Sequence, residues 1–323
     1  MSDPITVDEL RPGDHACLTY SDRDERLDIV AAFVADGLDR GDKIICYTED
    51  LSAEQLAAEL VSREVTGARD GQLVIAPSRD VGLTSVGAQP VVDVLGAELA
   101  VSVEQGYPGL RVSADMCWAV APTPAVDRLA EFETALGSLF TSGKLTAICE
   151  YDRDRFDPVT LAFAARSHAK TVAALAYHDD PVLRICRQHR PPGVRIAGEL
   201  DFTHRDALEQ ALSEAVRLDR HLYLNLAKLH FVDVACATLI AKTAFSLPPG
   251  RSMTIVASPM AASVLRLLGV EDSGAALSGG SSSGGVVSGR GPVGDALSGG
   301  ARPGGSFPGG DVRLRLIEAD ELP

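Results

Sequence analysis

The strongest constraint on the fold is a regular alternation of apolar, strand-like runs with amphipathic, helix-like segments over the first 180 residues. The run KIICYT at 43–48 is almost continuously apolar, which is typical of a strand buried on both faces. It follows a segment, 24–41, whose apolar residues recur at helical spacing and which ends at Gly41, a residue suited to a helix C-terminus. Because strands that alternate with helices are joined by crossovers, the pattern predicts an α/β domain with a mainly parallel sheet.

The other expected elements follow from the same two periodicities. In the first domain we expect strands at 15–20, 43–48, 72–77, 110–120 and 145–151, and helices at 24–41, 52–64, 90–105, 124–142 and 157–170. The pattern recurs on a smaller scale over 180–272 and predicts a four-stranded sheet with helices on one side. Its expected strands are LRICRQ, GVRIAGEL, HLYLNLAKL and SMTIVAS, and its expected helices are 203–218, 235–247 and 259–270.

The composition changes at residue 273. The segment 273–310 holds nearly half of the glycines of the chain, interspersed with serine and proline. Such a segment buries too little apolar surface to offset the entropy of ordering, so we predict that it is disordered. The last residues, 311–323, recover an apolar alternation, and either an edge strand or a solvated tail fits it.

Charge and cysteine content exclude several classes of protein. The formal net charge is −15 over 323 residues, and no run of lysine or arginine interrupts it. We therefore expect neither a direct nucleic-acid partner nor binding to an anionic membrane. The N-terminus lacks the basic and apolar regions of a signal peptide, and no run of 18 apolar residues is present. The 6 cysteines form no CxxC pair, which fits reduced, buried thiols, so we expect a cytoplasmic protein.

Three ordered blocks in the second half carry a family resemblance: GVRIAGELDFTHRDALEQAL, LYLNLAKLHFVDVACATLIAK and SMTIVASPMAASVLRLLGVED. They resemble the STAS domain (sulfate transporter and anti-sigma factor antagonist), in which a strand ends at an Asp that is followed by a Ser or Thr. The resemblance implies a bacterial signalling module that binds an anti-sigma factor kinase. In such antagonists the kinase phosphorylates the hydroxyl, and the added charge breaks the interface.

The matching turn in this chain carries no acceptor hydroxyl, because Ala235 stands at the phosphoacceptor position. Two interpretations remain open: a STAS domain fixed in its partner-binding state, or a degenerate one used only as an interaction unit. A shifted acceptor at Thr238 or Thr203 is a third alternative. By resemblance, the partner-binding loop residues are Asp201, Asp233, Val234, Ala235 and Cys236.

The first half carries a second resemblance. The motifs GDHACLTY, LRVSADMCWAV and AICEYDRDRF are similar to those of the MEDS domain, the methanogen/methylotroph sensory domain, over about residues 8–175. The resemblance implies a RecA/KaiC-like α/β fold without a P-loop that senses small molecules, simple hydrocarbon derivatives among them. The nearest P-loop-like string, GSLFTSGKL at 137–145, has the wrong spacing and precedes a strand, so we expect no nucleoside triphosphate hydrolysis.

Ligands of open α/β sheets bind beyond the carboxyl ends of the strands, which favours aromatic and acidic residues at those ends. Trp118 is the only tryptophan, and both a core role and a pocket-wall role are open for it. The candidate ligand-binding residues are His15, Cys17, Tyr20, Asp115, Trp118, Glu150 and Tyr151.

His15 and Cys17 point to the same face of their strand, and further cysteines lie in other strands, but the spacing matches no zinc motif. We therefore expect no metal and no cofactor. A nucleophile pair of Cys17 with His15, or of Cys149 with His168, is conceivable, yet no catalytic motif accompanies either pair, so we expect no enzyme.

The sequence thus predicts a cytoplasmic regulatory protein. A sensory domain over 1–178 would bind an unidentified small molecule, and a STAS-like domain over 182–272 would bind an anti-sigma factor of the serine kinase type or another regulatory protein. A short linker at 176–182 joins them. The alternatives are an enzyme that modifies a small molecule on the first domain, and a scaffold that senses nothing.

Overall fold

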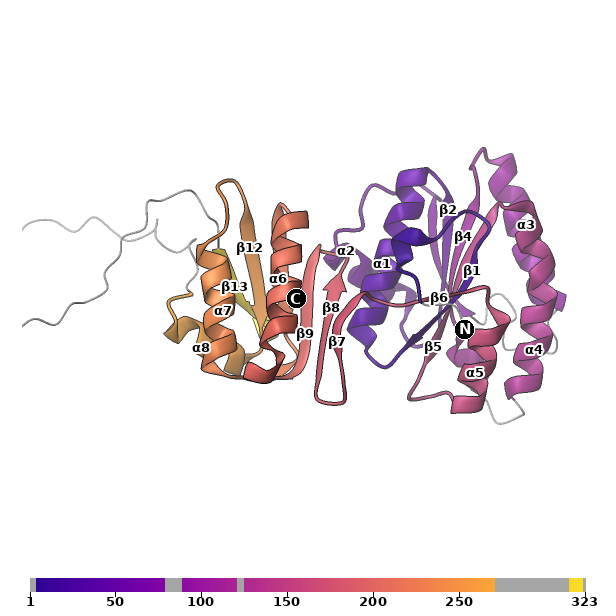
Figure 1. Ribbon diagram of the computed structural model, residues 1–323. Coiled ribbons are helices and arrows are strands. Elements are labelled where there is room, and N and C mark those ends of the chain that lie inside the picture. The colour runs from indigo at the N-terminus through magenta and orange to yellow at the C-terminus, as the bar shows by residue number, and fades with distance from the viewer. Residues whose placement is uncertain (1–3, 79–88, 121–124, 271–313, 322–323) are drawn as a thin grey trace, which may run out of the picture. The chain divides into compact units, whose positions relative to one another are not determined.

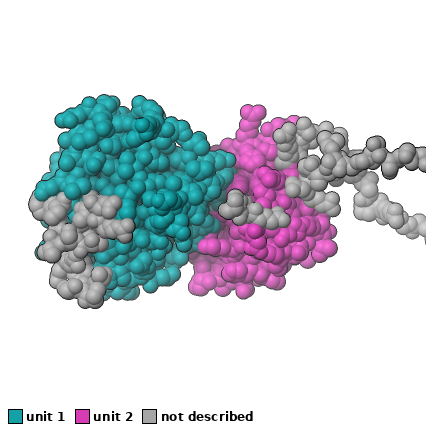
Figure 2. All heavy atoms as spheres, turned by 180° about the vertical axis from the view of Figure 1, so that it is seen from behind, with its two compact units in different colours: residues 1–177, 186–193 teal, residues 178–185, 194–323 magenta. Residues whose placement is uncertain are grey.

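The structure is a computed structural model that describes residues 4–78, 89–120, 125–270 and 314–321. The chain forms two compact units, residues 1–177 with 186–193 and residues 178–185 with 194–323 (Figure 2). Within the described ranges, no helix is both long enough and apolar enough to cross a membrane.

The first unit is built on a six-stranded sheet in which every neighbouring pair is parallel. The spatial order is β3-β2-β4-β5-β1-β6. The strands are β1 (His15–Tyr20), β2 (Lys43–Thr48), β3 (Leu73–Pro77), β4 (Leu110–Asp115), β5 (Leu145–Asp152) and β6 (Lys170–Val172). This sheet confirms the predicted parallel α/β fold of the first domain.

Helices cover both faces of this sheet (Figure 1). One face is covered by α1 (Arg23–Arg40) and α2 (Ala53–Ser62), and the other by α3 (Gln89–Glu104), α4 (Ala125–Leu136) and α5 (Pro158–Ser167). Ser52 and Gln55 form a capping box at α2, and α1 ends at Gly41, as expected, with a φ of 81°.

Two elements of the first unit end earlier than expected. The strand expected over 110–120 stops at Asp115, and Met116–Val120 form a 3-10 helix, η3. The Asp115 carboxylate accepts the backbone N–H of Cys117 at 3.0 Å, which turns the chain out of the sheet. The helix expected over 124–142 is α4 followed by a separate 3-10 helix, η4 (Gly137–Ser142). Trp118 therefore lies in η3 and not in a strand.

The second sheet has the order β13-β12-β10-β9-β8-β7, with β11 paired to β9. Its strands are β7 (Ala176–Asp179), β8 (Leu183–Gln188), β9 (Gly193–Leu200), β10 (His221–Leu226), β11 (Leu229–Val232), β12 (Ser252–Ala257) and β13 (Leu314–Glu318). Its helices α6 (Arg205–Leu218), α7 (Val234–Phe245) and α8 (Pro259–Leu267) pack against one another in chain order (Figure 1).

This sheet is larger than the four strands expected. Part of the expected linker, residues 176–179, forms β7. The expected strand HLYLNLAKL ends at Leu226 as β10, and a further strand that was not expected, β11, begins at Leu229. The break follows Asn225, whose side chain accepts the backbone N–H of Ala227 at 3.1 Å and bends the chain. Residues 314–318 form β13, parallel to β12. The predicted disorder of 273–310 concerns residues outside the described ranges.

Candidate functional site

A buried ion triad lies at the carboxyl ends of β4 and β5. The Arg26 guanidinium, on α1, donates to Glu150 at 2.5 Å and to Asp115 at 3.0 Å. It also lies over the ring of Tyr20, 5.2 Å from the ring centre. All three charged side chains are almost fully buried. Tyr20, Asp115 and Glu150 were expected as ligand-binding residues and lie together here, whereas the arginine that joins them was not singled out in the sequence.

The triad carries two carboxylates for one cation, and the two respond differently. Burial raises the pKa of Glu150 above its ordinary value, although Arg26 opposes the shift. Burial also acts on Asp115, but Arg26 and backbone N–H donors outweigh it and lower the pKa of that carboxyl. These contacts hold α1 against the carboxyl ends of the central strands β4 and β5.

A second polar cluster lies on the opposite face of the sheet, under α4. It brings together the Nε2 atoms of His15 and His168, the Sγ of Cys149 and the carboxylate of Glu133, all within 4.8 Å of one another. His15 Nε2 is 3.4 Å from Cys149 Sγ and 3.5 Å from Glu133 Oε2, and His168 Nε2 is 3.6 Å from the same oxygen. The hydroxyl of Tyr151 donates to the other oxygen of Glu133 at 2.8 Å.

Burial governs the protonation of this second cluster. It lowers the pKa of His15 to about 3 and that of His168 to about 4, and it raises the pKa of Glu133 to about 7. Burial also raises the pKa of Cys149 well above its ordinary value. His15 and Cys149 are therefore a neutral pair, and not the thiolate–imidazolium pair that activates a cysteine nucleophile.

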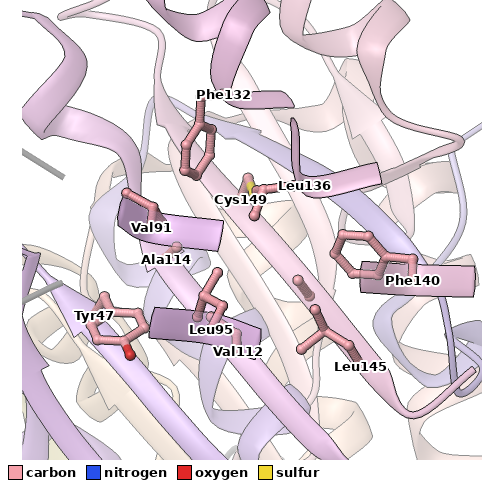
Figure 3. A pocket seen from close by; sticks show the side chains of 11 residues that line it. Tyr47, Val91, Leu95, Val112, Ala114, Phe132, Leu136, Phe140, Leu145 and Cys149 are labelled. Carbon is pink, nitrogen blue, oxygen red and sulfur yellow. The ribbon is translucent and has the colours of Figure 1, made fainter. Parts of the chain in front are cut away.

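An apolar pocket lies between the sheet and helices α3 and α4 (Figure 3). Its volume is about 390 Å³ when the open space at its mouth is included. It is lined by Tyr47, Val91, Leu95, Val112, Ala114, Phe132, Leu136, Phe140, Leu145, Ala147 and Cys149. The pocket and the second polar cluster share Cys149, and the ring of Phe140 stacks on His15 with the ring centres 4.3 Å apart.

The seven candidate ligand-binding residues are distributed over four places. Asp115, Glu150 and Tyr20 join the ion triad, whereas His15 and Tyr151 join the second cluster. Cys17 is buried in β1, with its Sγ 3.5 Å from the hydroxyl of Thr171. Trp118 is half-buried and meets Phe132, a pocket residue, edge to face with ring centres 5.5 Å apart. None of the seven lines the pocket itself.

Two residues central to these clusters escaped the sequence reasoning. Arg26 and Glu133 both lie on the buried face of an amphipathic helix, where charged residues are rare unless they are paired. Glu133 shares its helix face with Leu129, Phe132 and Leu136, which recur at helical spacing. A charged residue within such an apolar stripe is the sequence feature that could have identified both residues.

In the second unit, the loops that end β9 and β11 meet at the start of α7. Asp233 caps α7 by accepting the backbone N–H of Cys236 at 2.7 Å, and its own N–H donates to Leu200 at 3.1 Å. The Cys236 thiol donates to the carbonyl of Asp201 at 3.2 Å. Burial and the two nearby carboxylates raise the pKa of Cys236 to about 12, so this thiol is neutral and a poor nucleophile.

The predicted loop residues therefore divide into buried and exposed ones. Cys236 is buried beneath the loop, whereas Val234 is 69% exposed and Ala235 is also exposed. Phe231 and Phe202, which flank the two aspartates in the sequence, are 47% and 70% exposed. These four exposed apolar residues, Phe202, Phe231, Val234 and Ala235, each lie within two residues of Asp201 or Asp233 in the sequence, and we call them the loop patch.

The alternative acceptor residues have structural partners. Thr203 lies in a short 3-10 helix, η5 (Phe202–His204), capped by Asp201, which accepts the backbone N–H and the hydroxyl of Thr203 at 3.0 and 2.5 Å. The hydroxyl of Thr238 donates to the carbonyl of Val234 at 2.6 Å, one turn back along α7. Gly198, in the GELD element, has φ of 110°, and a Cβ there would lie 2.0 Å from the carbonyl oxygen of Val182. Glycine is therefore required at that position.

Comparisons with known proteins agree with both halves of this description. Residues 14–169 match the family model described as MEDS, the MEthanogen/methylotroph, DcmR Sensory domain, and residues 186–274 match that of the STAS domain. No curated protein matches the sequence at a significant level.

Two solved structures resemble part of the chain. The flagellar accessory protein FlaH of Methanocaldococcus jannaschii has a TM-score of 0.39 and 9% identity, and the match covers 56% of this chain and 80% of FlaH. A KaiC-like protein from Pyrococcus horikoshii has a TM-score of 0.38 and 14% identity, over 58% of this chain and 79% of its own.

The two family matches define a signalling or regulatory protein. Its N-terminal part is a MEDS domain and its C-terminal part is a STAS domain, as the motifs predicted.

Proposed function

We propose that the MEDS domain binds a small apolar molecule in the pocket between the sheet and helices α3 and α4. The observation that carries this proposal is the pocket itself, which lies within the residues that match a sensory domain and is lined almost entirely by apolar side chains. Pockets that bind small ligands are typically concave and apolar, with few polar groups.

The lining restricts the chemistry of the ligand. The Tyr47 hydroxyl and the Cys149 thiol are the polar groups among the lining side chains, so the pocket favours a molecule with little hydrogen-bonding capacity. The enclosed part of the pocket is small, because the 390 Å³ includes open solvent, so only a compact molecule fits between the lining side chains as they stand. A short hydrocarbon derivative fits both restrictions.

Trp118 provides the test. It is the only tryptophan of the chain, and its ring contacts Phe132, which lines the pocket. We expect small alcohols, haloalkanes or thioethers to change the intrinsic fluorescence of the full-length protein in a saturable way. Ala147→Leu, which places a larger side chain in the pocket, should abolish the saturable change.

The matched control is Ala58→Leu, the same substitution at an exposed position of α2, which should leave ligand binding unchanged. Thermal unfolding shows whether Ala147→Leu is folded at the temperature of the titration. A saturable response of equal strength in both variants would place the ligand elsewhere, and no response to any compound would favour a scaffold that senses nothing.

We further propose that the STAS domain docks a regulatory protein through the loop patch. The loop patch includes Ala235, at the position where antagonists of this family carry a phosphoacceptor, and the exposed Val234 and Phe231 lie close to it in the sequence. Exposed apolar residues close together are typical of interaction sites. A partner of the anti-sigma factor kinase type fits this surface. With Ala235 at the acceptor position, kinase action on that residue would not release the partner.

The enzyme alternative receives no support from the two cysteine–histidine pairs. His15 faces Cys149 and not Cys17, and both members of that pair are neutral in the metal-free protein. We therefore assign the second polar cluster a different role.

A further inference from the structure

In the second polar cluster, the acceptor atoms of His168 and of an ionised Glu133 face each other. His168 Nδ1 lies 2.8 Å from the carbonyl of Ala164, so Nδ1 carries the proton and Nε2 is left as a bare acceptor. Glu133 Oε1 accepts the Tyr151 hydroxyl, whereas Oε2 is buried without a hydrogen-bond partner among the described residues, as is His168 Nε2. Two buried acceptors 3.6 Å apart repel each other unless a proton or a metal ion lies between them.

The distances fit one small cation. Zinc binds nitrogen at about 2.0–2.1 Å, carboxylate oxygen at about 2.0–2.2 Å and thiolate sulfur at about 2.3 Å, so a tetrahedral site places its donor atoms roughly 3.3–3.6 Å apart. The observed separations of 3.4, 3.5 and 3.6 Å join His15, Cys149, Glu133 and His168 through consecutive edges of such a tetrahedron.

We propose that these four residues bind one divalent transition-metal ion, with Zn²⁺ as the best fit. Two imidazole nitrogens, one sulfur and one carboxylate oxygen are a borderline donor set that suits Zn²⁺ and not Mg²⁺ or Ca²⁺, which prefer oxygen. When the ion binds, the Cys149 thiol gives up its proton and Sγ becomes a thiolate ligand. The proton leaves to solvent, so no oxidant or reductant takes part.

Charge neutrality makes the burial of this ion favourable. Two neutral histidines, one thiolate and one carboxylate contribute two negative charges, which match the charge of the ion. The bound site therefore has no net charge, although the side chains of Glu133 and His168 are only 3% and 0% exposed. Without the ion, the same side chains bury unpaired polar atoms at a cost.

The surroundings are built like the outer shell of a metal site. Ligating histidines usually donate their second N–H to a carbonyl or carboxylate, as His168 does to Ala164, and ligating carboxylates are themselves hydrogen-bonded, as Glu133 is to Tyr151. The ligands come from β1, α4, β5 and the end of α5. The ion would therefore tie four separate elements of the MEDS domain together.

Co²⁺ serves as the spectroscopic probe, because thiolate-bound Co²⁺ absorbs in the near ultraviolet by charge transfer from sulfur. We expect the full-length, tag-free protein, stripped with a chelator, to bind one equivalent of Co²⁺ with this band and to lose the band on addition of Zn²⁺. Cys149→Ser should abolish the band, and His168→Gln should weaken binding of both metals at least tenfold.

The matched control is Cys46→Ser, the same substitution at another buried strand position, in β2, outside the cluster. It should bind one equivalent with the band intact. Wild-type protein that binds no Co²⁺, or that binds it without the band, overturns the proposal even if a variant fails to fold. Retention of the band in Cys149→Ser also overturns it.

This inference is independent of the ligand proposed for the pocket. Zn²⁺ binding by wild type and by Ala147→Leu would support the metal site whether or not an apolar compound binds. Loss of compound binding with metal binding intact would contradict the proposed sensory function alone.

Discussion

Single buried charges decide the chemistry of the MEDS domain. Arg26 and Glu133 each lie on a helix face whose other members are apolar, and each organises a polar cluster. Helical periodicity locates the apolar face of a helix, but it predicts that charged side chains face the solvent. Which charge is buried depends on a partner from a distant strand, and periodicity holds no information on that partner.

Replacement of Arg26 by methionine tests the ion triad. We expect Arg26→Met to lower the free energy of unfolding by about 3–5 kcal/mol, because it leaves two buried carboxylates without their cation. Urea unfolding followed by Trp118 fluorescence measures the change in the same unit. Arg23→Met, at an exposed position of the same helix, should change the stability by less than about 0.5 kcal/mol.

The loss of stability in Arg26→Met should also depend on pH, in a direction set by the pKa of Glu150. Without Arg26, the pKa of Glu150 in the folded state rises further above its unfolded value, so the folded state of the variant binds the extra proton. The stability deficit of Arg26→Met should therefore shrink as the pH falls from about 8 to about 5. A deficit that grows over this range would contradict the assignment of the buried carboxylates.

At the scale of elements, strand and helix identity followed from local patterns, whereas strand ends depended on contacts. The range 15–20 was predicted and observed as a strand, but the strand expected over 110–120 ends at the Asp115 turn. Apolar residues continue through Trp118, so no change of pattern marks the end. Short strands such as β6, β7 and β11 were missed because three or four residues carry too little periodicity.

The strand β13 gives the element-scale prediction. Leu314 and Leu316 are 5% and 7% exposed against β12, and Glu318 pairs with Arg266 at 2.5 Å. We expect Leu314→Ala combined with Leu316→Ala to lower the free energy of unfolding of the STAS domain by at least about 2 kcal/mol. Urea unfolding followed by circular dichroism checks it.

Arg315→Ala is the control from the same strand, because Arg315 is exposed between the two leucines. It should leave the stability within about 0.5 kcal/mol of wild type. An equal loss in the control and in the double variant would show that packing of the two leucines does not hold β13 in the sheet. Exposure of the β12 edge should also make the double variant more prone to aggregation.

At the scale of the whole molecule, the order of domains suggests that the MEDS domain supplies the regulation that the STAS loop has lost. If the STAS domain docks a partner through the loop patch, as proposed above, phosphorylation at Ala235 cannot release that partner, because alanine carries no hydroxyl. Ligand binding can change partner affinity only if the two states of the protein differ in their interaction with both molecules. This coupling is a hypothesis that the two separate domains motivate.

Capture of a purified anti-sigma factor of the serine kinase type tests the hypothesis. Full-length wild type and Ala235→Ser should capture it equally, whereas Ala235→Asp should bind at least tenfold more weakly, because it adds charge to the loop patch. A pocket ligand should change the affinity of wild type but not of Ala147→Leu. Equal capture by all three Ala235 forms would point to another surface, and no effect of any ligand would exclude the coupling.

The sequence by itself determined the two domains, the parallel sheet of the first, and the Asp233 turn without a hydroxyl, because periodicity, motifs and residue identity are local properties. Only the tertiary structure decided which distant residues meet. Arg26 joins Asp115 and Glu150, while His15, Glu133, Cys149 and His168 converge under α4, from positions up to 153 residues apart in the printed numbering. The physical reason is that crossovers and strand order place such residues together, and no spacing along the chain encodes those two choices.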